Sequence, residues 1–141
     1  KDRFRCEIKK EKDDAKNMEV CFFWKDRRVE YFDIKQMICH MLGVASKLLK
    51  YPDNKRILFL YLLYNPSDLD MSDAAKVETL RIYEDTCWAA QNIDFEALFA
   101  KIVDYLVIEK GLRASDETIR HMKSLFKFKL CDQNTYKTLL K

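Results

Sequence analysis

The sequence predicts a single α/β domain, in which short strands are joined by long amphipathic helices. Apolar and charged residues alternate over residues 3–9, as expected for a half-buried strand. Residues 34–50 carry apolar side chains at steps of three and four, which is the spacing of a helix with one buried face. Residues 56–64 form a continuous apolar run, typical of a central sheet strand. This order predicts a βαβ crossover, so we expect strands 3–9 and 56–64 to be parallel in one sheet.

The composition supports one compact domain in a reducing compartment. The chain has 141 residues, 48% of them hydrophobic, with only two Gly and two Pro. Its five cysteines form an odd set without CxxC spacing, so we expect reduced thiols and no structural zinc site. The sequence contains neither a signal-peptide pattern nor an apolar run of about 18 residues, which predicts a soluble, cytoplasmic protein without a membrane partner. Because the chain starts with Lys1 inside a patterned segment, we expect it to be truncated or processed.

Turn and cap residues delimit the first half of the chain. Residues 18–24 are a second strand candidate, and residues 25–28 allow a turn into a short strand at Val29–Phe32, which together predict a hairpin. Asp33 is a suitable N-cap for the following helix, which should end near Tyr51 and Pro52.

Three or four further helices are expected after residue 70. Ser72 is a cap for a helix through about Asn92, and Asp94 is a cap for the next, which has the most regular apolar stripe in the chain. Gly111 should end that helix as the residue after its C-terminus, and Ser115 should start a shorter helix.

The C-terminal residues are ambiguous. Residues 126–130 alternate like a strand but also allow the preceding helix to continue, and residues 132–141 predict a terminal helix. The resulting division is an N-terminal part, residues 1–67, and a helical extension, residues 68–141, packed on the same domain.

The first predicted strand carries the pattern with the clearest chemical meaning. Glu7 and Lys9 are two residues apart, so both point to the same face of the strand, beside Arg5. A carboxylate is a hard oxygen ligand suited to Mg²⁺, and a nearby lysine can orient an attacking water or stabilise charge on a phosphate. The plain alternative is an exposed Glu and Lys on a sheet face.

The order of the elements resembles the second half of the core of the PD-(D/E)xK, or restriction-endonuclease-like, nucleases. The sequence Cys-Glu-Ile-Lys is followed by a helix that begins with Gln36 in its first turn, and then by the apolar strand that ends before Pro66. The resemblance covers residues 1–67. It implies a restriction-endonuclease-like mixed sheet and hydrolysis of DNA phosphodiester bonds with Mg²⁺ or Mn²⁺.

The resemblance also implies roles for single residues. Glu7 would be the acidic metal ligand, Lys9 the catalytic lysine, and Gln36 a polar residue near the active site. Gln36 lies off the apolar stripe of its helix with His40, so a solvated helix face is its alternative explanation. The family also needs an Asp on the strand before Glu7, and Asp2 is on the opposite face of the predicted strand. Either that Asp precedes this chain or the site is incomplete.

Charge is unevenly distributed along the chain, although the net charge is only +3. Residues 51–109 hold five Lys and Arg against eleven Asp and Glu, whereas residues 110–141 hold eight against three. The basic ends could together contact a DNA backbone, and the residues we expect to do so are Arg5, Lys47, Lys127 and Lys129.

The acidic middle leaves a second function open. A non-catalytic module with the same frame could bind a protein partner through its acidic helices. A homodimer is compatible with the nuclease hypothesis, because restriction-like nucleases often act as dimers. The sequence has no phosphate-binding Gly-rich loop, nucleophile elbow or HExxH motif, which argues against P-loop, α/β-hydrolase and zinc-protease functions.

Overall fold

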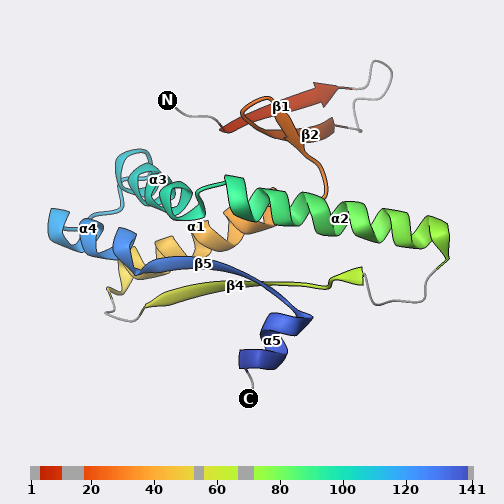
Figure 1. Cartoon of the computed structure of the whole chain (residues 1–141). Helices are drawn as coiled ribbons and strands as arrows, with labels where there is room; N and C mark the ends of the chain where they lie inside the picture. Colours follow the sequence, from red (N-terminus) through yellow and green to blue (C-terminus); the bar gives the residue numbers. More distant parts are fainter. Residues whose placement is uncertain (1–3, 11–17, 53–55, 67–71, 140–141) are drawn as a thin grey trace.

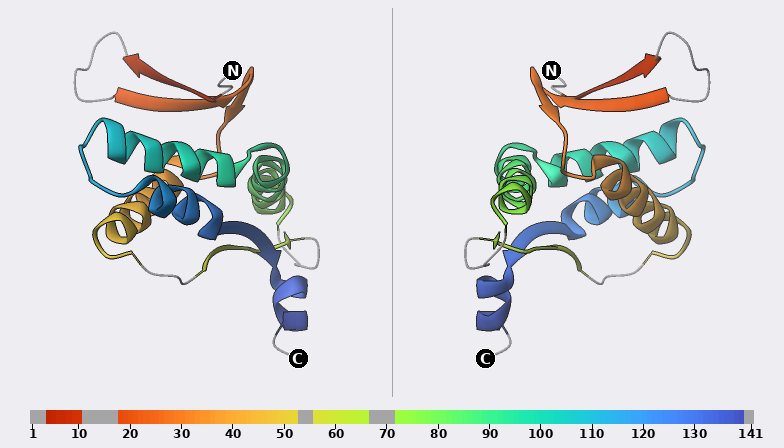
Figure 2. Two further views of the ribbon diagram at one scale, coloured as in Figure 1. Left: turned by 90° about the vertical axis from the view of Figure 1, so that its left-hand side faces the viewer. Right: turned by 90° about the vertical axis from the view of Figure 1, so that its right-hand side faces the viewer.

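The computed structural model of the chain describes residues 4–10, 18–52, 56–66 and 72–139. It has a mixed α/β architecture in which a β-hairpin lies on one side of a layer of helices and a two-stranded sheet lies on the other (Figures 1 and 2). In chain order the elements are β1 (Phe4–Lys10), β2 (Met18–Trp24), β3 (Arg27–Val29), α1 (Ile34–Lys50), β4 (Ile57–Leu63), α2 (Asp73–Asn92), α3 (Phe95–Ile108), α4 (Asp116–Leu125), β5 (Phe126–Asp132) and α5 (Gln133–Leu139).

The N-terminal strands form an antiparallel sheet in the order β1-β2-β3. Its register runs from Phe4 opposite Trp24 to Lys10 opposite Met18. Strand β2 also pairs antiparallel with β3, from Phe22 opposite Val29 to Trp24 opposite Arg27. This confirms the hairpin predicted after residues 18–24, but its second strand is Arg27–Val29 rather than Val29–Phe32. The chain reverses at Lys25, which has a positive φ of 56°, so the turn is tighter than the sequence suggested.

The second sheet pairs β4 with β5 in parallel, from Ile57 opposite Phe126 to Leu63 opposite Asp132. The ambiguous segment 126–130 is therefore a strand, and the part after residue 67 contributes to the sheet as well as to the helices. Helices α2 to α4 connect the two strands, so the crossover joins β4 to β5.

The prediction that residues 3–9 and 56–64 are parallel strands of one sheet is wrong. Strand β1 pairs with β2, β4 pairs with β5, and the two sheets are separate among the described residues. The helices lie between them (Figure 1). The physical reason is local, because β2 follows β1 closely in the chain and a short loop is closed at a smaller entropic cost than a long one.

The core lies between α1, α3 and the inner face of the β4–β5 sheet. Met41 and Ala45 of α1 and Phe99 of α3 have no exposed surface. The ring of Phe99 stacks on that of Phe126 of β5, with centroids 4.4 Å apart. The ring of Phe95 contacts that of Phe128 in a tilted arrangement, with centroids 4.2 Å apart. Among the described residues, no helix has the combination of length and apolar character needed to cross a membrane.

Three of the four predicted N-caps are confirmed by hydrogen bonds from the first turn. The carboxylate of Asp33 accepts from the Gln36 N–H at 2.8 Å, and that of Asp94 accepts from the Ala97 N–H at 2.9 Å. The Ser115 hydroxyl accepts from the Thr118 N–H at 3.1 Å. Ser72 occupies the cap position of α2 without such a side-chain bond.

The end of α3 is also as predicted. Gly111 follows the helix with a positive φ of 63°, a conformation that glycine adopts without steric penalty. The N–H of Leu112 then donates to the carbonyl of Leu106 at 3.2 Å, which satisfies one of the carbonyls at the helix end.

A buried carboxylate attaches the N-terminal sheet to the helices. Asp85 of α2 is only 6% exposed, and its Oδ2 accepts hydrogen bonds from the N–H groups of Glu30, Tyr31 and Phe32, at 3.2, 2.9 and 3.4 Å. Its Oδ1 accepts from the Arg27 guanidinium at 3.2 Å. Three successive backbone donors form an anion-binding nest, here occupied by a side chain of the same protein.

We predict that Asp85→Ala lowers the free energy of unfolding by about 3 kcal/mol, because it leaves one buried and two partly buried backbone N–H groups without their acceptor. Asp85→Asn retains one acceptor oxygen and should lose about half as much. Urea denaturation followed by circular dichroism measures both. The exposed neighbour Glu84 provides the control, since Glu84→Ala should change stability by less than about 0.5 kcal/mol. Equal losses for Asp85→Ala and Glu84→Ala would contradict the anchoring role.

The C-terminal ends of β4 and β5 are joined through side chains. The amide of Gln133 accepts from the Asn65 N–H and donates to the Asn65 carbonyl, both at 2.7 Å. Asn65 also donates from its side chain to the Tyr83 hydroxyl at 3.2 Å, which links this end of the sheet to α2. Burial is the main cause that raises the pKa of Tyr83, and the neighbouring thiol of Cys87 acts in the same direction.

Asp132 caps the terminal helix α5. Its Oδ1 accepts from the backbone N–H of Thr135 at 2.9 Å and from the Thr135 hydroxyl at 3.0 Å. These two hydrogen bonds, the backbone one first, lower the pKa of Asp132 below its usual value. The stabilisation that they give is present above the unfolded-state pKa, about 3.9, and is lost as the pH falls through the lower folded-state value.

We predict that Thr135→Val raises the pKa of Asp132 towards its ordinary value, because it removes the hydroxyl donor and keeps the N–H donor. A carbon-detected NMR titration of the carboxyl group measures this shift. Thr138→Val is the matched control, since the Thr138 hydroxyl donates to the Asn134 carbonyl, at 3.0 Å, and not to Asp132. An unchanged Asp132 pKa in Thr135→Val would show that the hydroxyl does not contribute.

Candidate functional site

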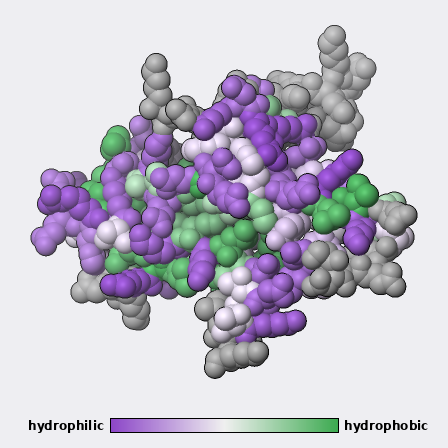
Figure 3. Space-filling model, in the orientation of Figure 1, coloured by the Kyte–Doolittle hydropathy of each residue, from purple (hydrophilic) through white to green (hydrophobic). Residues whose placement is uncertain are grey.

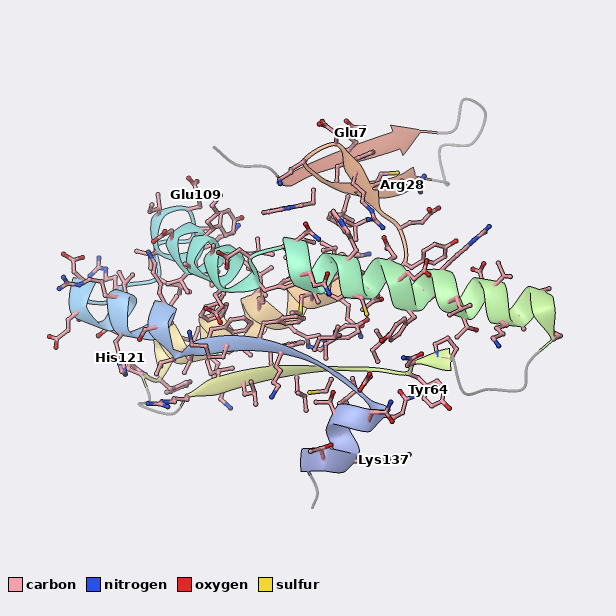
Figure 4. All side chains as sticks on the ribbon, viewed as in Figure 1. Glu7, Arg28, Tyr64, Glu109, His121 and Lys137 are labelled. Atoms are coloured by element: carbon pink, nitrogen blue, oxygen red, sulfur yellow. The ribbon has the colours of Figure 1, made fainter. Side chains whose placement is uncertain are left out.

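The predicted catalytic pair lies on β1, at the outer edge of the N-terminal sheet. Glu7 is half-buried and pairs with Cys21 of β2, while Lys9 pairs with Glu19. Figure 4 shows Glu7 on the hairpin, across α2 from the β4–β5 sheet. The strand that the sequence predicted for the Glu-x-Lys motif is therefore confirmed, and positions 7 and 9 share one face of it.

Arg5 precedes this pair on the same face of β1, opposite Phe23 in the register. The side chains of Arg5, Lys9 and Glu19 lie outside what the structure describes, as does Asp2. Their backbone positions nevertheless fix the order Arg5, Glu7, Lys9 along one side of the strand.

The register reveals an acidic position that the sequence analysis missed. Because Glu19 is the partner of Lys9, it lies on the face of the hairpin that carries Glu7, one diagonal step away. Opposite residues of an antiparallel pair have Cβ atoms about 5 Å apart, and diagonal neighbours are about 7–8 Å apart. The signal was present in the sequence as a Glu within a short apolar strand, but only the register assigns it a partner.

Gln36 is in a different part of the molecule. It is exposed on the first turn of α1 and, with His40, borders a cavity of about 330 Å³ against β4. The ring of His40 lies 5.9 Å from that of Phe59 of β4. Since β4 and β1 lie on opposite sides of the helices, the structure does not bring Gln36 together with Glu7 and Lys9 (Figure 1).

The predicted DNA-contacting lysines are also distant from the hairpin. Lys47 is exposed in the last turn of α1, and Lys127 and Lys129 are exposed on β5. The Lys127 ammonium forms an ion pair with Glu96 of α3 at 3.2 Å. These lysines therefore do not share a sheet with Arg5 of β1.

Three ion pairs among the described residues offset part of the charge segregation along the chain. Lys123 of α4 pairs with Asp104 of α3 at 2.6 Å, and Arg27 of β3 pairs with Asp85 at 3.2 Å. With the pair formed by Lys127 and Glu96, each of these contacts joins a basic end of the sequence to its acidic middle. The charge runs therefore serve folding as well as any surface.

The described residues provide a limited test of metal binding. Among them, no group of three or more His, Cys, Asp and Glu side chains could hold a metal ion. Mg²⁺ is commonly bound through only one or two carboxylates, with water and substrate phosphates completing its coordination. Glu7, with the acidic position at Glu19 on the same face, is compatible with that smaller requirement.

Cysteine chemistry offers no competing site in the described part of the chain. Cys21, Cys39, Cys87 and Cys131 are free thiols there, and Cys21 and Cys131 are buried. The chain matches no protein-family model, no curated protein and no solved structure.

Proposed function

We propose that this chain carries the catalytic strand of a metal-dependent nuclease that hydrolyses DNA phosphodiester bonds. The observation that supports the proposal most strongly is the register of the β1–β2 hairpin, in which Glu7, Lys9 and Glu19 occupy one face. Two acidic positions around a lysine fit the needs of phosphodiester hydrolysis better than the isolated Glu-x-Lys motif does.

Each residue has a distinct proposed task. The Glu7 and Glu19 carboxylates bind the cation, and Lys9 orients the attacking water and stabilises charge on the phosphate. When bound, Mg²⁺ supplies a Lewis acid that polarises a phosphate oxygen. Arg5, on the same face of the strand, can hold an adjacent phosphate of the DNA backbone through its planar guanidinium.

The proposal depends on the hairpin and on the resemblance of its motif to the PD-(D/E)xK nucleases, and not on a shared mixed sheet. Gln36 is left out of the proposed site because it lies beside β4. Lys47, Lys127 and Lys129 can contribute only to long-range attraction of DNA, which salt would weaken.

We predict that Glu7→Ala and Lys9→Ala each reduce cleavage of plasmid DNA with Mg²⁺ or Mn²⁺ by about 100-fold or more, because each removes a group that acts on the reacting phosphate. Glu19→Ala should reduce it in the same direction and raise the metal concentration required. Gel electrophoresis of the cleaved plasmid over a series of metal concentrations measures both effects.

Two exposed residues provide matched controls. Glu78→Ala on α2 and Lys50→Ala in the last turn of α1 remove the same charges away from the hairpin and should retain the cleavage rate. Cleavage that persists without metal, or equal rates in the wild type and the Glu7 and Lys9 variants, would refute the nuclease proposal.

A non-catalytic protein-binding module is the second candidate, and the surface of α2 favours it. Val77 and Ile82 are 49% and 38% exposed, and the carboxylates of Glu78 and Glu84 are exposed on the same helix. Apolar and acidic side chains together suit a basic protein partner. This candidate predicts no metal-dependent cleavage by the wild type.

A further inference from the structure

The outer face of the β4–β5 sheet is apolar and largely uncovered. Every residue from Ile57 to Leu63 is apolar or aromatic, a pattern typical of strands that are buried on both faces. The inner face packs on the helices, but Leu58 and Leu62 on the outer face are 61% and 60% exposed, and Tyr64 beyond them is 49% exposed. Figure 3, which views the sheet from its edge, shows hydrophobic residues across the middle of the molecule with hydrophilic residues around them.

Helix α5 covers one end of this outer face. It lies on the outer side of the sheet, opposite the other helices (Figures 1 and 2). Cys131, on the same face of β5 as the exposed Lys127 and Lys129, is only 1% exposed at this end of the strand. Parallel sheets are nearly always covered by helices on both faces, and here α5 covers only one end.

A pocket lies at the boundary between the covered and the uncovered parts. It has a volume of about 280 Å³ and is lined by Leu62, Leu63, Tyr64, Cys131, Asp132, Gln133 and Tyr136. Its apolar lining and its position beside exposed Leu62 make it a suitable receptor for one large apolar side chain.

Cationic side chains border the same face. In the register, Leu58 is opposite Lys127 and Leu60 is opposite Lys129. Arg56 precedes β4, and Lys137 projects from α5 (Figure 4). Lys127 has Glu96 as its partner, whereas the structure shows no ion pair for Arg56, Lys129 or Lys137 among the residues that it describes.

We propose that the outer face of the β4–β5 sheet binds an acidic amphipathic helix of a partner protein. The apolar stripe of that helix covers Leu58, Leu60 and Leu62, and one large apolar side chain enters the pocket beside Tyr136. Its carboxylates lie over β5, where they meet Lys129 and the neighbouring cations. This inference is independent of the nuclease proposal, because the hairpin is on the other side of the molecule.

The dimensions of the face agree with this occupant. Leu58 and Leu62 are four residues apart in a strand, or about 13 Å at 3.3 Å per residue. Helix residues i, i+4 and i+8 span about 12 Å at 1.5 Å per residue, so three successive stripe residues match the three leucines. Cations on the β5 side and leucines on β4 require a helix that is apolar on one flank and acidic on the other.

The test uses a synthetic, fluorescein-labelled helical peptide with Leu at positions i, i+4 and i+8, Phe at i+11 and Glu along one flank. A second peptide with Lys in place of each Glu keeps the same apolar stripe. Fluorescence anisotropy should show at least tenfold tighter binding of the Glu peptide, with an affinity that falls as salt rises. Amide NMR shifts should map its binding to β4, β5 and α5.

Variants localise the binding without disturbing the core. Leu58→Glu and Leu62→Glu together should weaken the Glu peptide at least tenfold, whereas Val77→Glu, at an exposed apolar position of α2, should leave its affinity within twofold. Lys129→Glu should reduce the preference for the Glu peptide.

Four outcomes would overturn the proposal. Equal affinity for both peptides would show that the face does not select an acidic partner. NMR shifts outside β4, β5 and α5 would show that the peptide binds at another site. Self-association in light scattering that Leu62→Glu abolishes, without peptide binding, would assign the face to a second copy of the chain. Binding to vesicles of anionic lipid, without peptide binding, would assign it to a membrane surface.

Discussion

The buried carboxylate of Asp85 is the interaction on which the arrangement of this molecule most depends. The N-terminal sheet forms one side of the fold, and the linker that follows it leads directly into α1. Asp85 binds three consecutive N–H groups of that linker and the guanidinium of Arg27. The same guanidinium lies over the ring of Trp88, 4.0 Å from its centroid, so one turn of α2 provides both an anion and an aromatic surface. A carboxylate buried to this extent is tolerated only because its hydrogen-bond capacity is satisfied.

Ion pairs also join segments that are distant in the sequence, but more weakly than Asp85 does. The pairs of Asp104 with Lys123 and of Glu96 with Lys127 join α3 to α4 and β5, and both are partly exposed, so each contributes little to stability by itself. Their effect on function is clearer. They reduce the acidic character of α3 and the basic character of β5. This weakens both hypotheses that were drawn from the charge distribution, namely DNA contact by the basic ends and protein binding by the acidic helices. Arg56, Lys129 and Lys137 remain as cations whose charge faces outward.

Local signals predicted the elements well, and distant pairings were not predictable. The alternation of apolar and charged residues predicted β1. The N-caps Asp33 and Asp94 predicted the starts of α1 and α3, and Gly111 predicted the end of α3. Each of these features depends on residues within one or two turns. The partner of β4 depends instead on β5, which follows it after three helices, and the apolar run at residues 57–63 is equally compatible with any neighbour. The prediction that β1 and β4 belong to one sheet was wrong for that reason.

The same difference between local and distant signals applies to the residues of the candidate site. The spacing of Glu7 and Lys9 placed them on one face of a strand, because strand periodicity is a property of the local chain. Gln36 was expected beside them only because the resemblance implied one sheet, and the separate sheets place it against β4. Glu19 could be found only through the register of a hairpin, which depends on the loop that joins its strands.

The two proposed functional surfaces differ in how they depend on the fold. The hairpin with Glu7 is held by the linker that Asp85 binds, so loss of this carboxylate would displace the strands from the helices. The leucine face of β4 is held instead by the stacking of Phe99 on Phe126 and by the amide pairing of Asn65 with Gln133. These contacts lie on the other side of the helices and do not include Asp85. A substitution at Asp85 should therefore affect the nuclease surface first, and the two surfaces can be engaged at the same time because the helix layer separates them.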